Sequence, residues 1–177
     1  MKNGNRMKRA DSMIVLGVDP GIARCGYGII EHSVSPVKLR YIECGVIETP
    51  AGTEPEQRLL AIARKLEQLL DAYQPNEVAM EKVFFFKNQK TIIVTGQAQG
   101  AIMLTLARRG YPIYQYTPLQ VKQALTTYGR ASKEQVQDVV MRLLRLSARP
   151  KPDDAADALA IAITHAHTNK TMSCRRS

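Results

Sequence analysis

The amino-acid sequence predicts an α/β fold in which a five-stranded mixed sheet is flanked by helices. Apolar and β-branched runs predict five strands, at residues 13–19, 25–30, 39–47, 78–84 and 111–116. Short connections join the first three, so we expect them to form an antiparallel meander. We expect the fourth and fifth strands to be parallel strands of the same sheet.

Composition indicates one soluble domain. The 177 residues are enough for a single core, 45% of them are hydrophobic, and no apolar run approaches the roughly 20 residues that cross a bilayer. The apolar run after the basic N-terminus breaks at Asp19, unlike a signal peptide, so we expect a cytoplasmic protein. Cys25, Cys44 and Cys174 are odd in number and widely spaced, which favours free thiols over disulfides or a zinc site.

Positive charge is concentrated at the two ends of the chain. The formal net charge is +9, and residues 1–12 and 168–177 each carry +3, which leaves +3 for the remainder. We expect both ends to be disordered tails around a domain that spans residues 13–167. Basic residues inside that domain are therefore the better evidence for a polyanionic partner.

The first strand ends at a carboxylate. Asp19-Pro20-Gly21 follows an apolar run and carries the residues that stop a strand. A lone carboxylate at the end of a buried strand is costly unless a cation compensates its charge. The alternative is that Asp19 only initiates the turn.

A predicted helix separates the third strand from the fourth. Thr53 and Glu56 form a capping-box pattern, and apolar residues recur at helical spacing up to Tyr73, so we expect the helix to begin at Thr53. In the fourth strand, Glu81 is out of place among apolar residues. It is the second candidate acid.

Three consecutive phenylalanines begin at the last residue of the predicted fourth strand. Phe84, Phe85 and Phe86 precede Lys87, and aromatic rings stack on unpaired bases while lysines attract phosphates. Phe84 and Lys87 are therefore candidate DNA-binding residues. The alternative is that two of the three rings finish the strand inside the core.

The helix predicted over residues 89–109 is apolar almost all round and carries Gly96 and Gly100 one turn apart. It packs either closely against its own sheet or partly against a second copy of the chain. Periodicity does not decide which of three apolar residues faces outward: Ile93, Val94 or Ile102.

Two capped helices follow the fifth strand. Thr117 and Pro118 give one an N-cap and a first-turn proline, and Ser132 with Gln135 forms a capping box for the other. Three cations flank the break between them, where a helix N-terminus could hold a phosphate: Lys122, Arg130 and Lys133. A solvated surface is the alternative.

The last predicted helix begins near residue 153 and carries Asp154 and Asp157 on one face. Capping of the helix start explains this pair in isolation. Together with Asp19 and Glu81, however, it makes four carboxylates from separate apolar elements. Such oxygen donors suit Mg²⁺ or Mn²⁺, and two such ions can hydrolyse a phosphodiester. His165 lies eight residues after Asp157, roughly on the same face. We expect a structural or surface role for it, and the alternative is that it approaches the acids.

Six short motifs follow one another in order and span about residues 13–167. They are Gly17-Val18-Asp19-Pro20-Gly21 with Gly26-Tyr27-Gly28, Met80-Glu81-Lys82-Val83-Phe84, Gly96-Gln97-Ala98-Gln99-Gly100, Val121-Lys122-Gln123, Ser132-Lys133-Glu134-Gln135-Val136 and Asp154-Ala155-Ala156-Asp157-Ala158-Leu159-Ala160. Each is moderately specific, whereas their succession is highly so. Together they resemble the RuvC family of bacterial crossover junction endonucleases.

This resemblance implies an RNase H-like fold and a homodimer that nicks two opposed strands of a Holliday junction. It implies that Mg²⁺, two ions per subunit with Mn²⁺ as a substitute, is held by the catalytic acids Asp19, Glu81, Asp154 and Asp157. Lys122 and Lys133 would contact DNA or support catalysis, and Phe84 would act on junction bases. Members of the family work with the RuvA–RuvB branch-migration complex. The run of three phenylalanines and the basic N-terminal extension depart from the family pattern.

Two other functions fit parts of the pattern. An actin-like or hexokinase-like phosphotransferase also opens with a strand, an Asp and a Gly, but it needs a second phosphate-binding strand pair and a longer chain. A non-catalytic nucleic-acid-binding protein on the same fold would not need all four acids. Metal-dependent nicking separates this last alternative from a nuclease.

Overall fold

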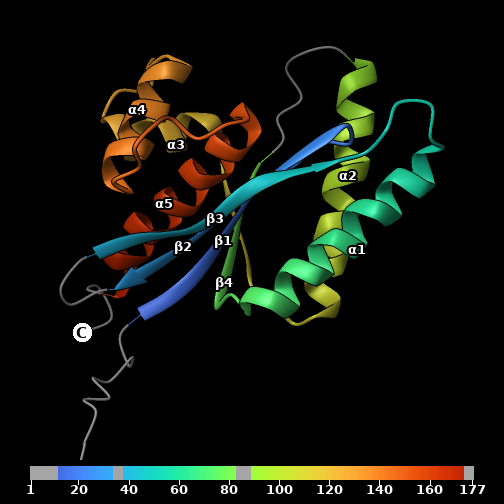
Figure 1. Cartoon of the computed structure of the whole chain (residues 1–177), viewed down its shortest axis with the longest axis horizontal. Helices are drawn as coiled ribbons and strands as arrows, with labels where there is room; N and C mark the ends of the chain where they lie inside the picture. The colour runs from blue at the N-terminus through green and yellow to red at the C-terminus, as the bar shows by residue number, and fades with distance from the viewer. Residues whose placement is uncertain (1–11, 34–37, 83–88, 174–177) are drawn as a thin grey trace, which may run out of the picture.

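A five-stranded sheet in the order β3-β2-β1-β4-β5 forms the centre of the molecule (Figure 1). The computed structural model describes residues 12–33, 38–82 and 89–173. An antiparallel meander contains β1 (Ser12–Asp19), β2 (Arg24–Ser33) and β3 (Lys38–Glu48), and β4 (Glu77–Glu81) and β5 (Ile113–Tyr116) extend the sheet in parallel. The predicted mixed sheet is confirmed, with β5 shorter than expected.

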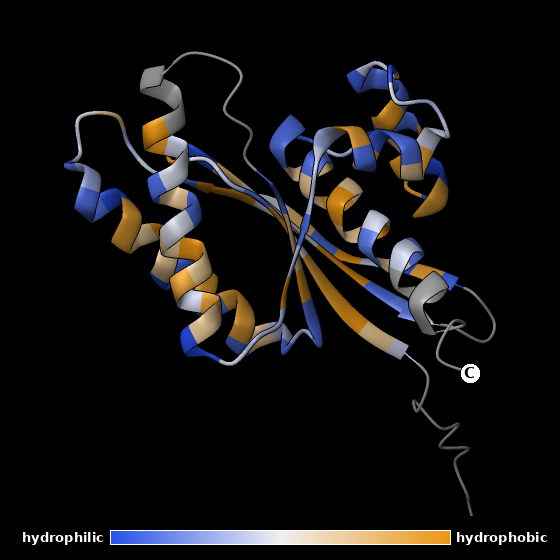
Figure 2. Ribbon diagram, turned by 180° about the vertical axis from the view of Figure 1, so that it is seen from behind, coloured by the Kyte–Doolittle hydropathy of each residue, from blue (hydrophilic) through white to orange (hydrophobic). Residues whose placement is uncertain are grey.

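Helices cover both faces of this sheet (Figure 1). One face carries α1 (Pro55–Tyr73) and α2 (Gln89–Arg108), and the other carries α3 (Pro118–Thr126), α4 (Lys133–Leu143) and α5 (Asp153–Ser173). Strand residues alternate between the two resulting cores: Val15 and Ala79 pack with α5, whereas Leu16, Val18 and Met80 pack with α1 and α2. Figure 2 shows hydrophobic residues along the central strands and hydrophilic ones in the loops.

The start of α5 lies directly against the strands because glycines line its path. A Cβ added at Gly17 would stand 2.0 Å from the carbonyl oxygen of Ala158, and one at Gly26 would stand 2.0 Å from that of Asp154. Only glycine allows this approach at either position. The contact therefore fixes the first turns of α5 over the ends of β1 and β2.

One predicted helix start is wrong. The first turn of α1 begins at Pro55, with Glu54 as an N-cap that makes no side-chain capping hydrogen bond, so the capping box expected of Thr53 and Glu56 does not form. Proline suits the first helical position because it has a fixed φ and no N–H to lose. The predicted Thr117 N-cap and the capping box that starts at Ser132 are both confirmed. The last helix, α5, continues to Ser173, past the boundary expected at residue 167.

The apolar helix α2 has a buried face and an exposed face. Ile102 is fully buried, whereas Ile93 is 65% and Leu104 62% exposed. A Cβ added at Gly96 or Gly100 would meet nothing within 4 Å, so these glycines do not serve close packing inside the subunit. None of the helices among the described residues is long and apolar enough to cross a membrane.

Candidate active site

Two of the predicted acids lie side by side at the carboxyl ends of neighbouring strands. Val18 of β1 pairs in parallel with Met80 of β4, so the next residues along, Asp19 and Glu81, lie side by side where both strands end. Alternation places Asp19 on the same face as Gly17, which packs on α5. A side-chain hydrogen bond joins the two carboxyl groups.

The other two acids come from the first turns of α5. Both Asp154 and Asp157 are partly exposed, and both act electrostatically on the more buried Asp19. Their positions follow from the glycine contacts that hold α5 against β1 and β2. The structure therefore gathers all four predicted acids at one end of the sheet.

The electrostatics of this cluster disfavour full ionisation. Burial, together with the negative charges of Glu81, Asp157 and Asp154, raises the pKa of Asp19 to about 8. Burial also raises the pKa of Glu81, and that of Asp157 in spite of the opposing charge of Lys133. Such a group of carboxylates becomes favourable when cations balance it.

Side-chain cations already contact the two α5 acids. Arg24 Nε lies 3.0 Å from Asp154 Oδ2, and Lys133 Nζ lies 2.9 Å from Asp157 Oδ2 and 3.5 Å from Asp153 Oδ2. In this side-chain arrangement, the described residues contain no group of three or more acids, histidines or cysteines that could hold a metal ion. The donor chemistry still fits Mg²⁺ or Mn²⁺, because the four clustered acids offer only carboxylate oxygens.

A cavity of about 260 Å³ opens beside the acids. Glu81 and Asp157 line one part of it, and Lys122 and Lys133 contribute positive charge. The remaining wall is mostly apolar and comes from α3, α4 and α5: Pro118, Val121, Val136, Ala160 and Ile161. Arg130 is exposed and does not line this cavity, so the structure brings together two of the three predicted cations.

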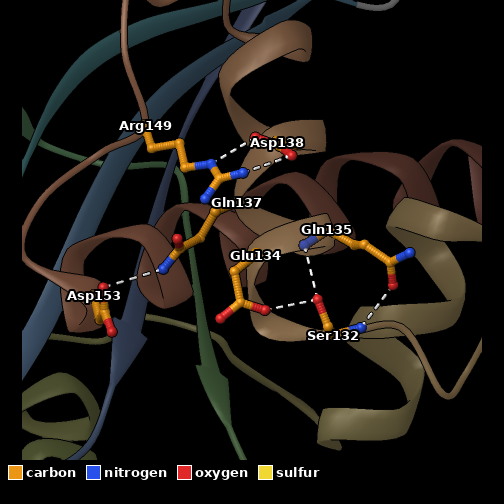
Figure 3. A network of polar contacts seen from close by, with 7 residues as sticks. All are labelled: Ser132, Glu134, Gln135, Gln137, Asp138, Arg149 and Asp153. Carbon is orange, nitrogen blue, oxygen red and sulfur yellow. Dashed lines mark hydrogen bonds and ion pairs between the residues drawn. The ribbon is translucent and has the colours of Figure 1, made fainter.

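A polar network fixes the start of α4 (Figure 3). Lys133 is the first residue of this helix. The N-cap is Ser132, whose hydroxyl accepts from the Gln135 backbone N–H at 3.3 Å. One turn on, Gln137 donates to Asp153 at the start of α5 over 3.2 Å. These contacts tie the N-terminal turn of α4 to that of α5, which holds Lys133 against Asp157.

Three further site residues have different outcomes. Phe84 and Lys87 lie outside the described residues. His165 is 1% exposed, and its Nε2 and Nδ1 each lie 2.7 Å from an oxygen, of Glu77 and Tyr116 respectively, which confirms the expected structural role.

Sequence reasoning missed Arg24. The sequence feature that could have indicated Arg24 is its position two residues before Gly26. Residues two apart in a strand share a face, and Gly26 packs on α5. That signal has meaning only once α5 is known to cover β2.

Comparisons with known proteins agree with this geometry. The model of the family described as crossover junction endodeoxyribonuclease RuvC matches residues 15–165. The crossover junction endodeoxyribonuclease RuvC of Clostridioides difficile (strain 630) is 51% identical over 158 residues, which are 89% of this chain and 92% of that protein.

Solved structures support the same assignment. The structure of Thermus thermophilus RuvC has a TM-score of 0.83 at 35% identity, covering 90% of this chain and 97% of the other. T. thermophilus RuvC in complex with a Holliday junction substrate has a TM-score of 0.82 at 34% identity, covering 90% and 96%. The RNase H-like mixed sheet is thereby confirmed. By family model, sequence identity and structure together, the chain belongs to the RuvC family of crossover junction endodeoxyribonucleases.

Proposed function

We propose that this nuclease resolves Holliday junctions in recombination and DNA repair through paired, magnesium-dependent nicks in two opposed strands. The observation that carries the proposal is the convergence of four carboxylates from β1, β4 and α5 at one end of the sheet. A relative of the same fold has been solved with a Holliday junction substrate.

Each acid has a role that its surroundings suggest. Asp19 and Glu81 form the half-buried base of the site, and Asp154 and Asp157 lie nearer solvent at the start of α5, so the four together would hold two Mg²⁺ ions. When bound, these ions supply an activated water and stabilise the leaving oxygen of the phosphodiester. Mn²⁺ has the same preference for oxygen ligands and is expected to substitute.

The remaining residues bind and orient DNA. Lys122 and Lys133 line the cavity next to the acids, where they would contact phosphates of the cut strand. Arg130 and Lys87 would extend this contact by charge, and Phe84 would stack on bases freed at the junction. Unstacking at the crossover brings the phosphate to be cut within reach of the acids.

The assembly belongs to the same proposal. We infer a cytoplasmic homodimer that works with the RuvA–RuvB branch-migration complex, as the family resemblance implies. The exposed apolar face of α2 supports self-association, because large apolar side chains there are left in water.

A cleavage assay on defined substrates tests the proposal. Purified protein is incubated with a four-way junction and with a linear duplex of the same sequence, with and without Mg²⁺. We expect nicking of the junction only when Mg²⁺ is present. Asp19→Asn should still bind the junction, because phosphate contacts come from lysines elsewhere, but it should not cut. Near-normal nicking by Asp19→Asn would refute the assignment, and binding without any nicking by the unaltered chain would favour a non-catalytic protein.

A further inference from the structure

Arg24 lies at the first position of β2, at the solvent-facing rim of the acid cluster. Its Nε is 3.0 Å from Asp154 Oδ2 and 3.9 Å from Glu48 Oε1 on the neighbouring strand β3. The side chain is 46% exposed, so the guanidinium is held by one acid of the site and remains accessible to a ligand.

The site therefore has a side-chain cation on each acid of α5. Lys133 of α4 forms an ion pair with Asp157. Arg24 of β2 forms one with Asp154, from another side of the start of α5. Lys133 lies in one of the six motifs that resemble the RuvC family, whereas Arg24 lies between those motifs and has no role in the proposed chemistry.

An arginine in this place has two suitable partners. Its guanidinium is always charged and has a planar set of donors that matches carboxylate and phosphate equally well. A divalent cation on Asp154 would compete with the guanidinium for the same oxygens and repel it. The released guanidinium would then face solvent at the rim of the site, where the sugar-phosphate strand has to pass to reach the acids.

We propose that Arg24 changes partner during the working cycle. It pairs with Asp154 before metal binding, and it contacts a phosphate of the cut strand once a divalent cation has taken Asp154. This proposal rests on the proposed function. It makes Arg24 a positioning residue that couples metal binding to DNA binding.

Metal affinity tests the first half of this proposal. Mn²⁺ binding is measured by calorimetry without DNA for the unaltered chain, for Arg24→Gln and for Arg40→Gln as a matched control. Arg40 also forms an exposed ion pair, with Glu31 at 2.6 Å, but far from the acids. We expect Arg24→Gln to bind Mn²⁺ about three- to tenfold more tightly, because a competing positive charge is gone. Thermal unfolding verifies that each variant is folded.

The salt dependence of junction binding tests the second half. Affinity for a four-way junction is measured against salt concentration with Ca²⁺ and with no divalent ion. In Ca²⁺, Arg24→Gln should lose about one unit of the slope of log K against log salt, the amount that one phosphate contact contributes. Without a divalent ion the slope should match that of the unaltered chain, because Arg24 is then paired with Asp154.

The outcomes separate the two proposals. Equal Mn²⁺ affinity in the unaltered chain and Arg24→Gln overturns the competition, and an unchanged slope in Ca²⁺ overturns the phosphate contact. Either result leaves the nuclease assignment standing. Failure of the unaltered chain to bind Mn²⁺ overturns both proposals.

Discussion

At the scale of single residues, Asp19 lowers the stability of the metal-free protein when its carboxyl group is ionised. Its pKa of about 8 in the folded protein, against a usual value of 3.8, means that the folded state binds its proton more tightly than the unfolded chain does. Between these two values the free energy of unfolding therefore falls as pH rises. A bound cation would reverse this loss, because it stabilises the ionised carboxyl groups.

Asp19→Asn should consequently stabilise the metal-free protein at alkaline pH. We expect its free energy of unfolding to exceed that of the unaltered chain by about 2 kcal/mol at pH 8 to 9, and the difference to disappear near pH 4. Urea unfolding across this pH range, in the presence of a chelator, measures it. Equal stabilities at every pH would mean that Asp19 is not held in a buried cluster of acids.

Lys133 should affect cutting more than binding. Burial opposes its charge, but the contacts with Asp157 and Asp153 outweigh burial and raise its pKa, so it stays protonated beside the acids. Lys133→Ala should slow junction cleavage by about 10²-fold or more, because one charge aimed at the reacting phosphate is lost. Lys65→Ala, an exposed lysine of α1, is the control. Unchanged cleavage rate and salt dependence would identify Lys133 as a solvated surface residue.

At the scale of elements, the sequence predicted the strand ends and helix starts that depend on neighbouring residues. The strand stop at Asp19 and the capping box at Ser132 depend on neighbouring residues, and both are confirmed. Thr53 carries an equally good local signal, but Pro55 provides a better helix start two residues later. The Arg24–Asp154 pair depends on which helix covers β2, and the pattern of a single chain does not contain that information.

His165 should stabilise the docking of α5 on β4 and β5. Its buried ring bridges Glu77 and Tyr116, and it also lies 4.4 Å from the Tyr114 ring, centroid to centroid. His165→Ala should lower the free energy of unfolding by about 3 kcal/mol, because it leaves the mostly buried Glu77 without its nearest partner. Tyr116→Phe, which removes one hydroxyl, should cost about 1 kcal/mol. A loss below 1 kcal/mol for His165→Ala in denaturant unfolding would contradict this role.

At the scale of the whole molecule, the described residues of one subunit form one cluster of four acids, but resolution of a junction needs two cuts. A Holliday junction has two-fold symmetry, and a symmetric dimer would present two clusters to it in one binding event.

One face of α2 contains residues 93, 100 and 104, because residue 100 lies about two turns and residue 104 about three turns after residue 93. Two of them are large exposed side chains, and the third is Gly100, with open space above it. Such a face allows a second α2 to approach closely.

Leu104→Glu should therefore break the dimer without unfolding the chain. Leu104 is 62% exposed in the isolated subunit, so a charge there costs little folding energy but would be buried and unpaired at a dimer contact. We expect sedimentation to show a dimer for the unaltered chain and a monomer for Leu104→Glu, with weaker junction binding and nicks that are no longer paired.

Leu143→Glu, an exposed apolar residue at the end of α4, is the matched control and should remain dimeric. Cleavage of a supercoiled cruciform plasmid separates the two kinds of cutting, because a single nick relaxes the plasmid, whereas paired nicks within one binding event linearise it. If the unaltered chain sediments as a monomer at micromolar concentration with junction present, yet still linearises the plasmid in one binding event, one subunit makes both cuts and α2 serves another partner.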